Sequence, residues 1–259
     1  MARYPWMAAL LCLTMSLSPV SSGAVTLDEA ARQLEAMTWY SEDYPPFNYE
    51  ADGEAAGIAV DILMVAFEKI GVDLKPRDIK IVPWNRGYNF IRNRAGTALF
   101  SMTYTPERER IMKFVGPALP SRVSIIALKE RKLTVDNPAD LEGLTIGVVR
   151  EDVGDLLLQK IVPANAVISR RNTLKQLLYL LTTGRVDAVS YSINVLNNAV
   201  RLTGGTPGAF EELLVLREAQ LGYAFHNDTD PAVLAPLQKA VDELKADGTI
   251  DKIVARYGN

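Results

Sequence analysis

Residues 57–71, GIAVDILMVAFEKIG, are the stretch that decides the fold class. Apolar residues recur there every three or four positions, which predicts a helix with one buried face. Strand-like runs at residues 37–40 and 79–82 flank it, and the order continues with a helical run at 84–94 and a strand at 97–102. Strands that alternate with helices are typical of a parallel sheet covered by helices.

The second half of the chain repeats this alternation. Strand-like and helical runs follow one another at residues 123–127, 145–149, 153–161, 166–169, 173–183 and 187–190. Asp230 and Thr249 then suit the N-caps of two final helices. Two modules of similar size predict an α/β protein of two lobes, each a mainly parallel sheet flanked by helices.

The chain would have to cross between the lobes twice. We expect lobe 1 at residues 25–119 and 225–259 and lobe 2 at 120–224, with hinge crossings near 117–122 and 218–225. Ligands of such sheets bind in crevices at the carboxyl ends of the strands. The crevice between the lobes is therefore the predicted binding site, and closure about the hinge is the predicted motion.

Residues 1–24 are typical of a secretory signal peptide. Arg3 supplies a positive start, residues 6–20 form an apolar run, and residues 22–24, Ser-Gly-Ala, suit signal-peptidase cleavage. The alternative is a retained membrane anchor, but the run is shorter than the roughly twenty apolar residues of a span. We therefore predict export to the periplasm, with no stable membrane insertion after cleavage.

Composition excludes several classes of function. Cys12, the only cysteine, lies inside the signal segment, so the exported chain has neither a disulfide nor a thiolate site. His226 is the only histidine, which excludes a histidine-based metal cluster. The formal net charge of −3 gives no reason to expect nucleic acid or an anionic membrane as a partner. We predict no metal site and no cofactor.

Five short blocks occur in an order that resembles a known family. They lie at residues 43–47 with 57–61, 103–108, 144–149, 184–188 and 244–249. Together they resemble the bacterial type 2 periplasmic solute-binding proteins, in the polar amino-acid-binding branch, family 3. The resemblance implies a Venus-flytrap clamp that captures a small carboxylate-bearing solute, an amino acid or related polar compound, and delivers it to an ABC permease. We predict a monomer without enzyme activity.

The resemblance assigns the solute's carboxylate to the turn after residues 97–102. There Arg108 would grip it, because a guanidinium presents paired N–H donors that match a carboxylate. Thr103 would add its hydroxyl and Ser101 chiefly its backbone carbonyl. The alternative for Arg108 is a solvated turn residue, which is how we interpret Arg110.

Two aromatic residues match the family's ligand walls. Tyr44, just before two prolines, would stack on the ligand, and Trp84 would form a second wall. Each also has a structural alternative: Tyr44 could pack on its own loop, and Trp84 could be a core residue at a helix start.

The sequence departs from the family where an acid usually holds the ligand's ammonium group. The best-matched position is Ser192, and a hydroxyl does not balance a positive charge as a carboxylate does. Either another acid has taken this role or the ligand is not a standard α-amino acid. Glu42 is the candidate acid, and its alternative is an exposed loop residue.

The second lobe's anion loop also differs from the family pattern. Backbone N–H groups at the helix start near Val153 could still face a carboxylate. Arg150 could assist or pair with its acidic neighbours. Arg86 lies near the expected cleft and could contact a second acidic group, or it could be a surface residue.

Two rival functions stay open. Periplasmic cyclohexadienyl dehydratases share this fold and its arginine, and they need a cleft acid of tuned pKa. Glu42, Glu151 and Asp152 are the available acids, and nothing in the sequence distinguishes among them. The other rival is a ligand-sensing partner of a membrane receptor.

Overall fold

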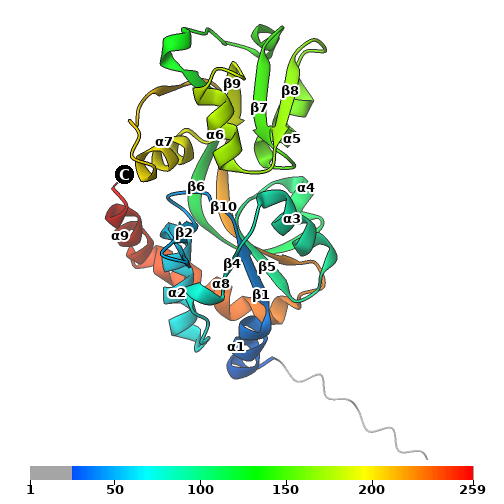
Figure 1. Cartoon of the computed structure of the whole chain (residues 1–259). Helices are drawn as coiled ribbons and strands as arrows, with labels where there is room; N and C mark the ends of the chain where they lie inside the picture. The colour runs from blue at the N-terminus through cyan, green and yellow to red at the C-terminus, as the bar shows by residue number, and fades with distance from the viewer. Residues whose placement is uncertain (1–24, 259) are drawn as a thin grey trace, which may run out of the picture.

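The computed structural model describes residues 25–258, and the predicted signal peptide lies outside them. Figure 1 shows two lobes joined by the long strands β6 (Met112–Leu128) and β10 (Phe210–His226). These strands pair antiparallel along their whole length, from Met112 opposite His226 to Leu128 opposite Phe210. They form the middle of one eight-stranded sheet of order β4-β1-β5-β10-β6-β9-β7-β8.

The first lobe contains one parallel part of this sheet. Its strands are β1 (Thr38–Ser41), β4 (Lys80–Ile81) and β5 (Thr97–Thr103), with a separate hairpin of β2 (Tyr49–Ala51) and β3 (Glu54–Ala56). Its helices are α1 (Leu27–Ala36), α2 (Ile58–Ile70), α3 (Trp84–Asn93), α4 (Pro106–Glu109), α8 (Pro231–Ala246) and α9 (Thr249–Arg256), with the 3₁₀ turn η1 (Pro76–Asp78). The carboxyl ends of its parallel strands face the second lobe (Figure 1).

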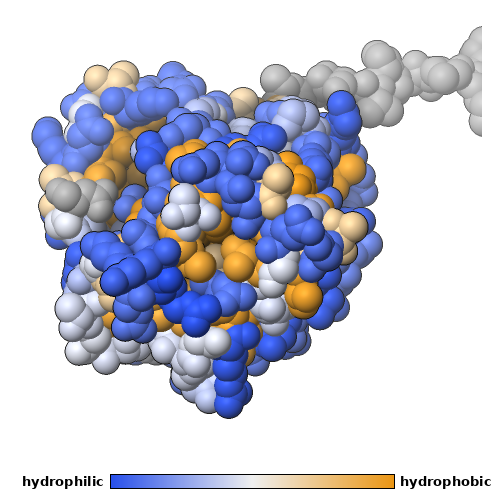
Figure 2. Space-filling model, turned by 90° about the horizontal axis from the view of Figure 1, so that it is seen from above, coloured by the Kyte–Doolittle hydropathy of each residue, from blue (hydrophilic) through white to orange (hydrophobic). Residues whose placement is uncertain are grey.

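The second lobe contains the other parallel part. Its strands are β7 (Thr145–Val149), β8 (Val167–Arg171) and β9 (Ala188–Tyr191). Its helices are α5 (Val153–Ile161), α6 (Leu174–Thr182) and α7 (Ile193–Leu202), with the 3₁₀ turns η2 (Lys129–Arg131) and η3 (Pro138–Leu141). Seen from the end of this lobe, hydrophilic residues predominate on the surface, and hydrophobic residues show in hollows between them (Figure 2).

An aromatic core fixes the first lobe. Trp39 of β1 meets the rings of Phe67 and Phe225 edge-on, with ring centroids 5.1 and 5.4 Å away. All three side chains are fully buried. Burial of such a side chain stabilises the fold by about 1.5–3 kcal/mol. The core therefore holds β1 and β5, and the starts of the loops that follow them, in fixed positions.

The structure differs from the sequence prediction in three places. The hinge crossing expected near residues 117–122 is part of strand β6, and Leu119, Pro120 and Ser121 pair there with β10. The hairpin of β2 and β3 and the helix α7 were not predicted. Helix α7 was missed because the asparagines of its sequence, INVLNNAVRL, weaken the helical pattern. The lobe boundaries stay a prediction, and they fall inside β6 and β10.

No helix within residues 25–258 is both long enough and apolar enough to span a membrane.

Candidate functional site

Arg108 is positioned by a one-turn helix directly after β5. Pro106 starts α4, and the Thr105 hydroxyl accepts a hydrogen bond from the Arg108 N–H at 3.2 Å. This cap turns the arginine inward, and only 1% of it is exposed, whereas Arg110 lies on the surface. Two arginines that are two residues apart in the chain therefore lie in different environments, one buried and one exposed.

The Arg108 guanidinium lies between the lobes. Its Nη1 donates to the Thr103 carbonyl at 3.2 Å, and its Nη2 donates across the lobes to the Glu151 carbonyl at 3.5 Å. Its Cζ lies 5.0 Å from the centre of the Trp84 ring and 5.3 Å from that of Tyr88. Within residues 25–258 the buried Nε has no hydrogen-bond partner. Arg108 is thus a desolvated cation, and one of its three guanidinium nitrogens, Nε, has no partner on the described chain.

The Glu151 carbonyl is held in place by an acid that the sequence prediction missed. Asp155, buried in α5, accepts the Glu151 N–H at 3.1 Å. Arg170 of β8 pairs with the same carboxylate at 2.9 Å. The pairing of Asp155 with an arginine 15 residues away depends on how β8 lies beside α5, so no short sequence pattern shows it.

Two acids, one from each lobe, lie near the guanidinium. Glu42 follows β1 and is 8% exposed, and Asp152 caps α5 by accepting the Val153 N–H at 2.6 Å. Burial raises the pKa of Glu42 well above its ordinary value, and the charges of Asp152 and Asp43 raise it further, while Arg108 lowers it. Burial also raises the pKa of Asp152, and Arg108 opposes this shift. Burial and the neighbouring acids therefore favour the protonated form of both carboxyl groups, while Arg108 favours the ionised form.

Tyr44 connects the first lobe with the second. Its ring stacks on Phe47 at 5.5 Å and meets the edge of Tyr191, from β9, at 5.6 Å. Burial has the largest effect on the pKa of Tyr44 and raises it, while the hydroxyls of Ser121 and Ser192, which lie close to the Tyr44 hydroxyl, lower it. Ser192 thus faces a tyrosine in this arrangement of the lobes.

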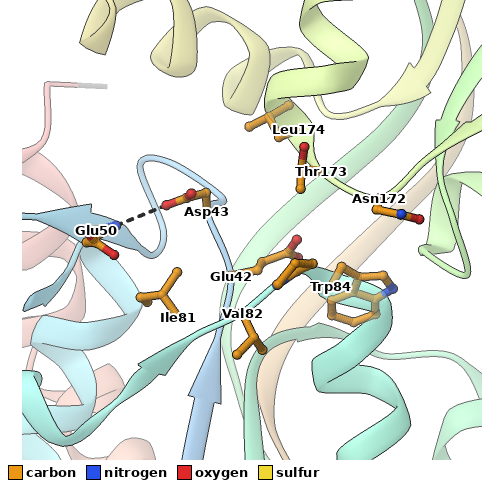
Figure 3. Close-up of a pocket in the computed structure, with 10 residues that line it drawn as sticks. Glu42, Asp43, Glu50, Ile81, Val82, Trp84, Asn172, Thr173 and Leu174 are labelled. Carbon is orange, nitrogen blue, oxygen red and sulfur yellow. Dashed lines mark hydrogen bonds between the residues drawn. The ribbon is translucent and has the colours of Figure 1, made fainter. Parts of the chain in front are cut away.

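A cavity of about 230 Å³ lies beside these groups (Figure 3). Both lobes line it, the first through Glu42, Asp43, Glu50, Ile81, Val82, Pro83 and Trp84, and the second through Asn172, Thr173 and Leu174. The Glu42 side chain and the Trp84 ring lie across from Asn172 and Thr173 (Figure 3). Such a space, enclosed by both lobes, suits a small polar molecule.

The remaining predicted residues fall into two groups. Ser101 is buried and its hydroxyl donates to Asn48 Oδ1 at 2.8 Å, while the Val153 N–H is already occupied by Asp152. Arg86 and Arg150 are exposed, and neither lines the cavity; Arg86 lies over the Phe90 ring at 5.4 Å. Of the ten predicted site residues, only Glu42 and Trp84 line the cavity, and Arg86 and Arg150 are the two that are exposed.

Tyr191 and Ser121 are close to the site but were not among the predicted residues, and Asp152 was named only as an acid available to an enzyme. Tyr191 directly precedes Ser192, so its position at the end of a buried strand was a usable signal. Ser121 lies within β6, where the sequence gives no sign that it faces Tyr44.

Within residues 25–258, no three side chains of the metal-binding types His, Cys, Asp and Glu form a group suited to a metal ion.

Comparison with known proteins agrees with this architecture. The chain is 27% identical over 258 residues to a probable histidine-binding protein of Neisseria gonorrhoeae, covering 96% of this chain and 93% of that protein. It is 22% identical over 256 residues to the arginine-binding extracellular protein ArtP of Bacillus subtilis, covering 97% of each. The structure of a mutant of the arginine-binding protein ArgBP from T. maritima superposes with a TM-score of 0.75 at 22% identity, covering 88% of this chain and 98% of that one.

These similarities confirm the predicted type 2 two-lobed α/β fold. The model of the bacterial extracellular solute-binding proteins, family 3, matches residues 38–259, which include every element of the site. The predicted solute-binding role is confirmed with it, and this chain belongs to the family 3 bacterial extracellular solute-binding proteins.

Proposed function

We propose that this protein captures a small carboxylate-bearing solute, an amino acid or related polar compound, between its lobes. It would deliver the solute to an ABC permease. The observation that carries the proposal is the buried Arg108 guanidinium, which lies between the lobes with its Nε unpartnered within the described chain. A buried donor without an acceptor costs about 1–3 kcal/mol, so an arriving acceptor would gain that amount.

A carboxylate fits the free side of Arg108 better than other acceptors. Its two oxygens match the guanidinium donors, and a charge-assisted hydrogen bond is about twice as strong as a neutral one. The rings of Trp84 and Tyr88 on the same guanidinium limit access to a small group. Relatives named as histidine- and arginine-binding proteins support an amino acid as the solute.

We also propose where the protein is located in the cell. Residues 1–24 have the pattern of a signal peptide, and the family consists of extracellular proteins, which together support export to the periplasm. The proposal takes the exported protein to be a monomer. The exported protein would meet its permease there.

The proposal is tested by titrating Arg108→Ala with candidate amino acids, di-acids and amines in a thermal-shift screen. A ligand at 100 times its Kd stabilises a protein by about 2.7 kcal/mol, so binding by the unmodified protein is easily seen. We expect Arg108→Ala to lose at least about 2 kcal/mol of binding free energy, because a buried charged contact disappears. Arg110→Ala, which removes an exposed arginine from the same turn, is the matched control.

Equal affinity of Arg108→Ala and the unmodified protein would contradict the assignment of Arg108. Because Arg108 is buried, Arg108→Lys is a second variant that keeps the charge but not the paired donors. Circular dichroism checks that each variant folds.

A dehydratase-like enzyme of the same fold is the rival function, and the relatives named as amino-acid-binding proteins do not favour it. A carboxyl group whose pKa is raised by burial is suited to protonate a leaving group. Incubation with a cyclohexadienyl acid would decide between the two, since loss of water together with carbon dioxide produces an aromatic ring that absorbs in the ultraviolet. Our proposal of a binder expects no such product.

A further inference from the structure

A cavity of about 350 Å³ between α4 and α5 lies outside the candidate solute site. These two helices face each other across the lobes, and residues of α3 and β10 complete the wall (Figure 1). The cavity shares no lining residue with the one beside Glu42. Tyr88, which lines it, stacks on Trp84 at 5.6 Å, so each cavity has one ring of this pair in its wall. The two spaces are therefore separate.

One apolar side of α5 forms the wall on the second lobe. Val153, Leu156 and Leu157 line the cavity at helix positions i, i+3 and i+4, which lie on the same side of a helix. Within residues 25–258 none of the three belongs to either hydrophobic core, whereas Leu158 of the same helix does. Leu156 and Leu157 are only half-buried. This apolar surface would gain stability from an apolar occupant that displaces water from it.

The first lobe contributes an aromatic ring to the same cavity. Tyr88 of α3 lines it and is 7% exposed. Thr105 lines it too, but its hydroxyl is occupied as the acceptor of the Arg108 N–H. Cavities that bind small molecules measure about 300–1,000 Å³ and have mainly apolar walls with a few polar groups, and this cavity has both properties. The walls from the two lobes therefore suit the hydrocarbon part of a small ligand.

The charged groups in the wall leave one cation without a partner. Lys160 of α5 pairs with Glu107 of α4 at 2.9 Å, so these two charges balance. Arg217 of β10 is half-buried in the wall, and its side chain has no ion pair within the described part of the chain. The acid next to it in sequence, Glu218, pairs with Arg122 at 2.7 Å instead. The free guanidinium of Arg217 can therefore bind a carboxylate through paired N–H donors.

We propose that this cavity is a second ligand site, which binds a small amphipathic carboxylate. The hydrocarbon part of the ligand lies against α5 and the Tyr88 ring, and its carboxylate binds Arg217. A single negative charge complements the one guanidinium that has no partner in the wall. Because both lobes line the site, its ligand adds contacts between them and favours the arrangement in which α4 and α5 face each other. The inference does not depend on which solute Arg108 holds.

The test uses three probes that separate the two parts of such a ligand. Hexanoate has both the chain and the charge, hexanamide has the same shape without the charge, and acetate has the charge without the chain. Titration of the isotope-labelled protein, followed by the NMR signals of its backbone amides, measures each Kd and locates each probe. We expect hexanoate to shift the signals of residues 153–157 and of Arg217 saturably. It should bind at least about fivefold more tightly than hexanamide or acetate.

Three variants test the wall. Arg217→Gln removes the charge, so it should bind hexanoate and hexanamide equally, to within about twofold. Leu157→Gln makes the apolar side of α5 polar without touching either core, so it should keep the fold, as circular dichroism can check, and weaken hexanoate at least about threefold. Arg110→Gln is the matched control, because it removes an exposed arginine next to α4 that does not line the cavity. It should keep the full affinity for hexanoate.

Absence of any saturable shift with hexanoate would overturn the second site. Shifts centred on residues 42–43 and 172–174 would place hexanoate in the other cavity and would overturn it as well. Equal affinity of Arg217→Gln and the unmodified protein for hexanoate would contradict the binding of the carboxylate by Arg217. The same loss in Arg110→Gln as in Arg217→Gln would show a general effect of positive charge, which also contradicts a built site.

Discussion

Arg108 and Arg110 show how strongly the burial of one residue depends on its neighbours in the chain. Both follow the same strand and both are arginines, yet one is buried and the other is exposed. The Thr105 cap starts a single helical turn, and residues two positions apart on such a turn point to nearly opposite sides. The Thr105 hydroxyl, three residues before Arg108, therefore helps to set the turn in which Arg108 is a buried, desolvated donor and Arg110 a surface group.

The titration of Glu42 gives a residue-scale prediction for the protein without solute. Its pKa is raised in the folded state, mainly by burial and then by Asp152 and Asp43, with Arg108 opposing. The folded protein therefore keeps a proton that the unfolded chain, with an ordinary pKa of about 4.3, has released. Stability should be full below about pH 4 and should fall as the pH rises toward the folded-state pKa, by at most about 1.4 kcal/mol per pH unit for each such group.

Chemical denaturation of the unmodified protein and of Glu42→Gln at pH values from about 4.5 to 7.5 measures this effect. The variant should lose less stability across the range, because Asp152 alone still contributes. Identical pH slopes for the two proteins would show that Glu42 has no raised pKa in the fold.

At the scale of elements, β6 and β10 are the feature on which the two-lobed shape depends. Gly222 of β10 lies between β5 on one side and β6 on the other, at a shift in the register of both pairings. Tyr104, just after β5, fills the space that a side chain at this position would need. A Cβ at Gly222 would lie 2.5 Å from Tyr104 Cε2 and 2.7 Å from the Val115 carbonyl oxygen.

Gly222→Ala should therefore destabilise the protein by about 1–3 kcal/mol through overpacking. Urea denaturation measures the change in the free energy of unfolding. Gly205→Ala is the comparison: its Cβ would lie 2.6 Å from Val200 Cγ1, so the methyl group also meets a close neighbour, but in an exposed loop instead of between buried strands. A loss no larger for Gly222→Ala than for Gly205→Ala would mean that Tyr104 moves away at little cost.

At the scale of the whole molecule, few side chains hold the lobes together. Arg108 reaches the Glu151 carbonyl, Tyr44 meets Tyr191, and Lys160 of α5 pairs with Glu107 of α4 at 2.9 Å. The Lys160 ammonium lowers the pKa of Glu107 to about 2. A solute that contacts both lobes would add to these contacts and shift the population toward the closed form.

The ion pair between Glu107 and Lys160 should contribute little to solute affinity, because both side chains are more than half exposed. Lys160→Ala should weaken binding by at most about fivefold. Titration calorimetry measures this, with Lys175→Ala as a control that removes an exposed lysine without an ion pair on the described chain. A loss of about a hundredfold or more would make this pair a main closure contact.

The sequence predicted most elements of the fold because its buried strands and helices have clear periods. Helix α7 and the hairpin of β2 and β3 escaped prediction, since short strands and asparagine-rich helices have weak patterns. For the site, the sequence named Arg108, Glu42 and the two aromatic residues, which follow strands that end at the same sheet edge. Arg86 and Arg150 were further candidates, each with a structural alternative, and their exposure in the fold distinguishes them from the buried Arg108.

By itself the sequence determined the two-lobed α/β class, the family and the presence of an arginine turn after β5. These features could be predicted because periodicity and short motifs involve residues that are close together in the chain. Only the tertiary structure decided which charges meet. Glu42 and Asp152 are 110 positions apart, and Tyr44 and Tyr191 are 147 apart, by their residue numbers. Contacts of this kind depend on how two lobes close on a shared sheet, and burial then changes the energy of every charge that closure removes from water.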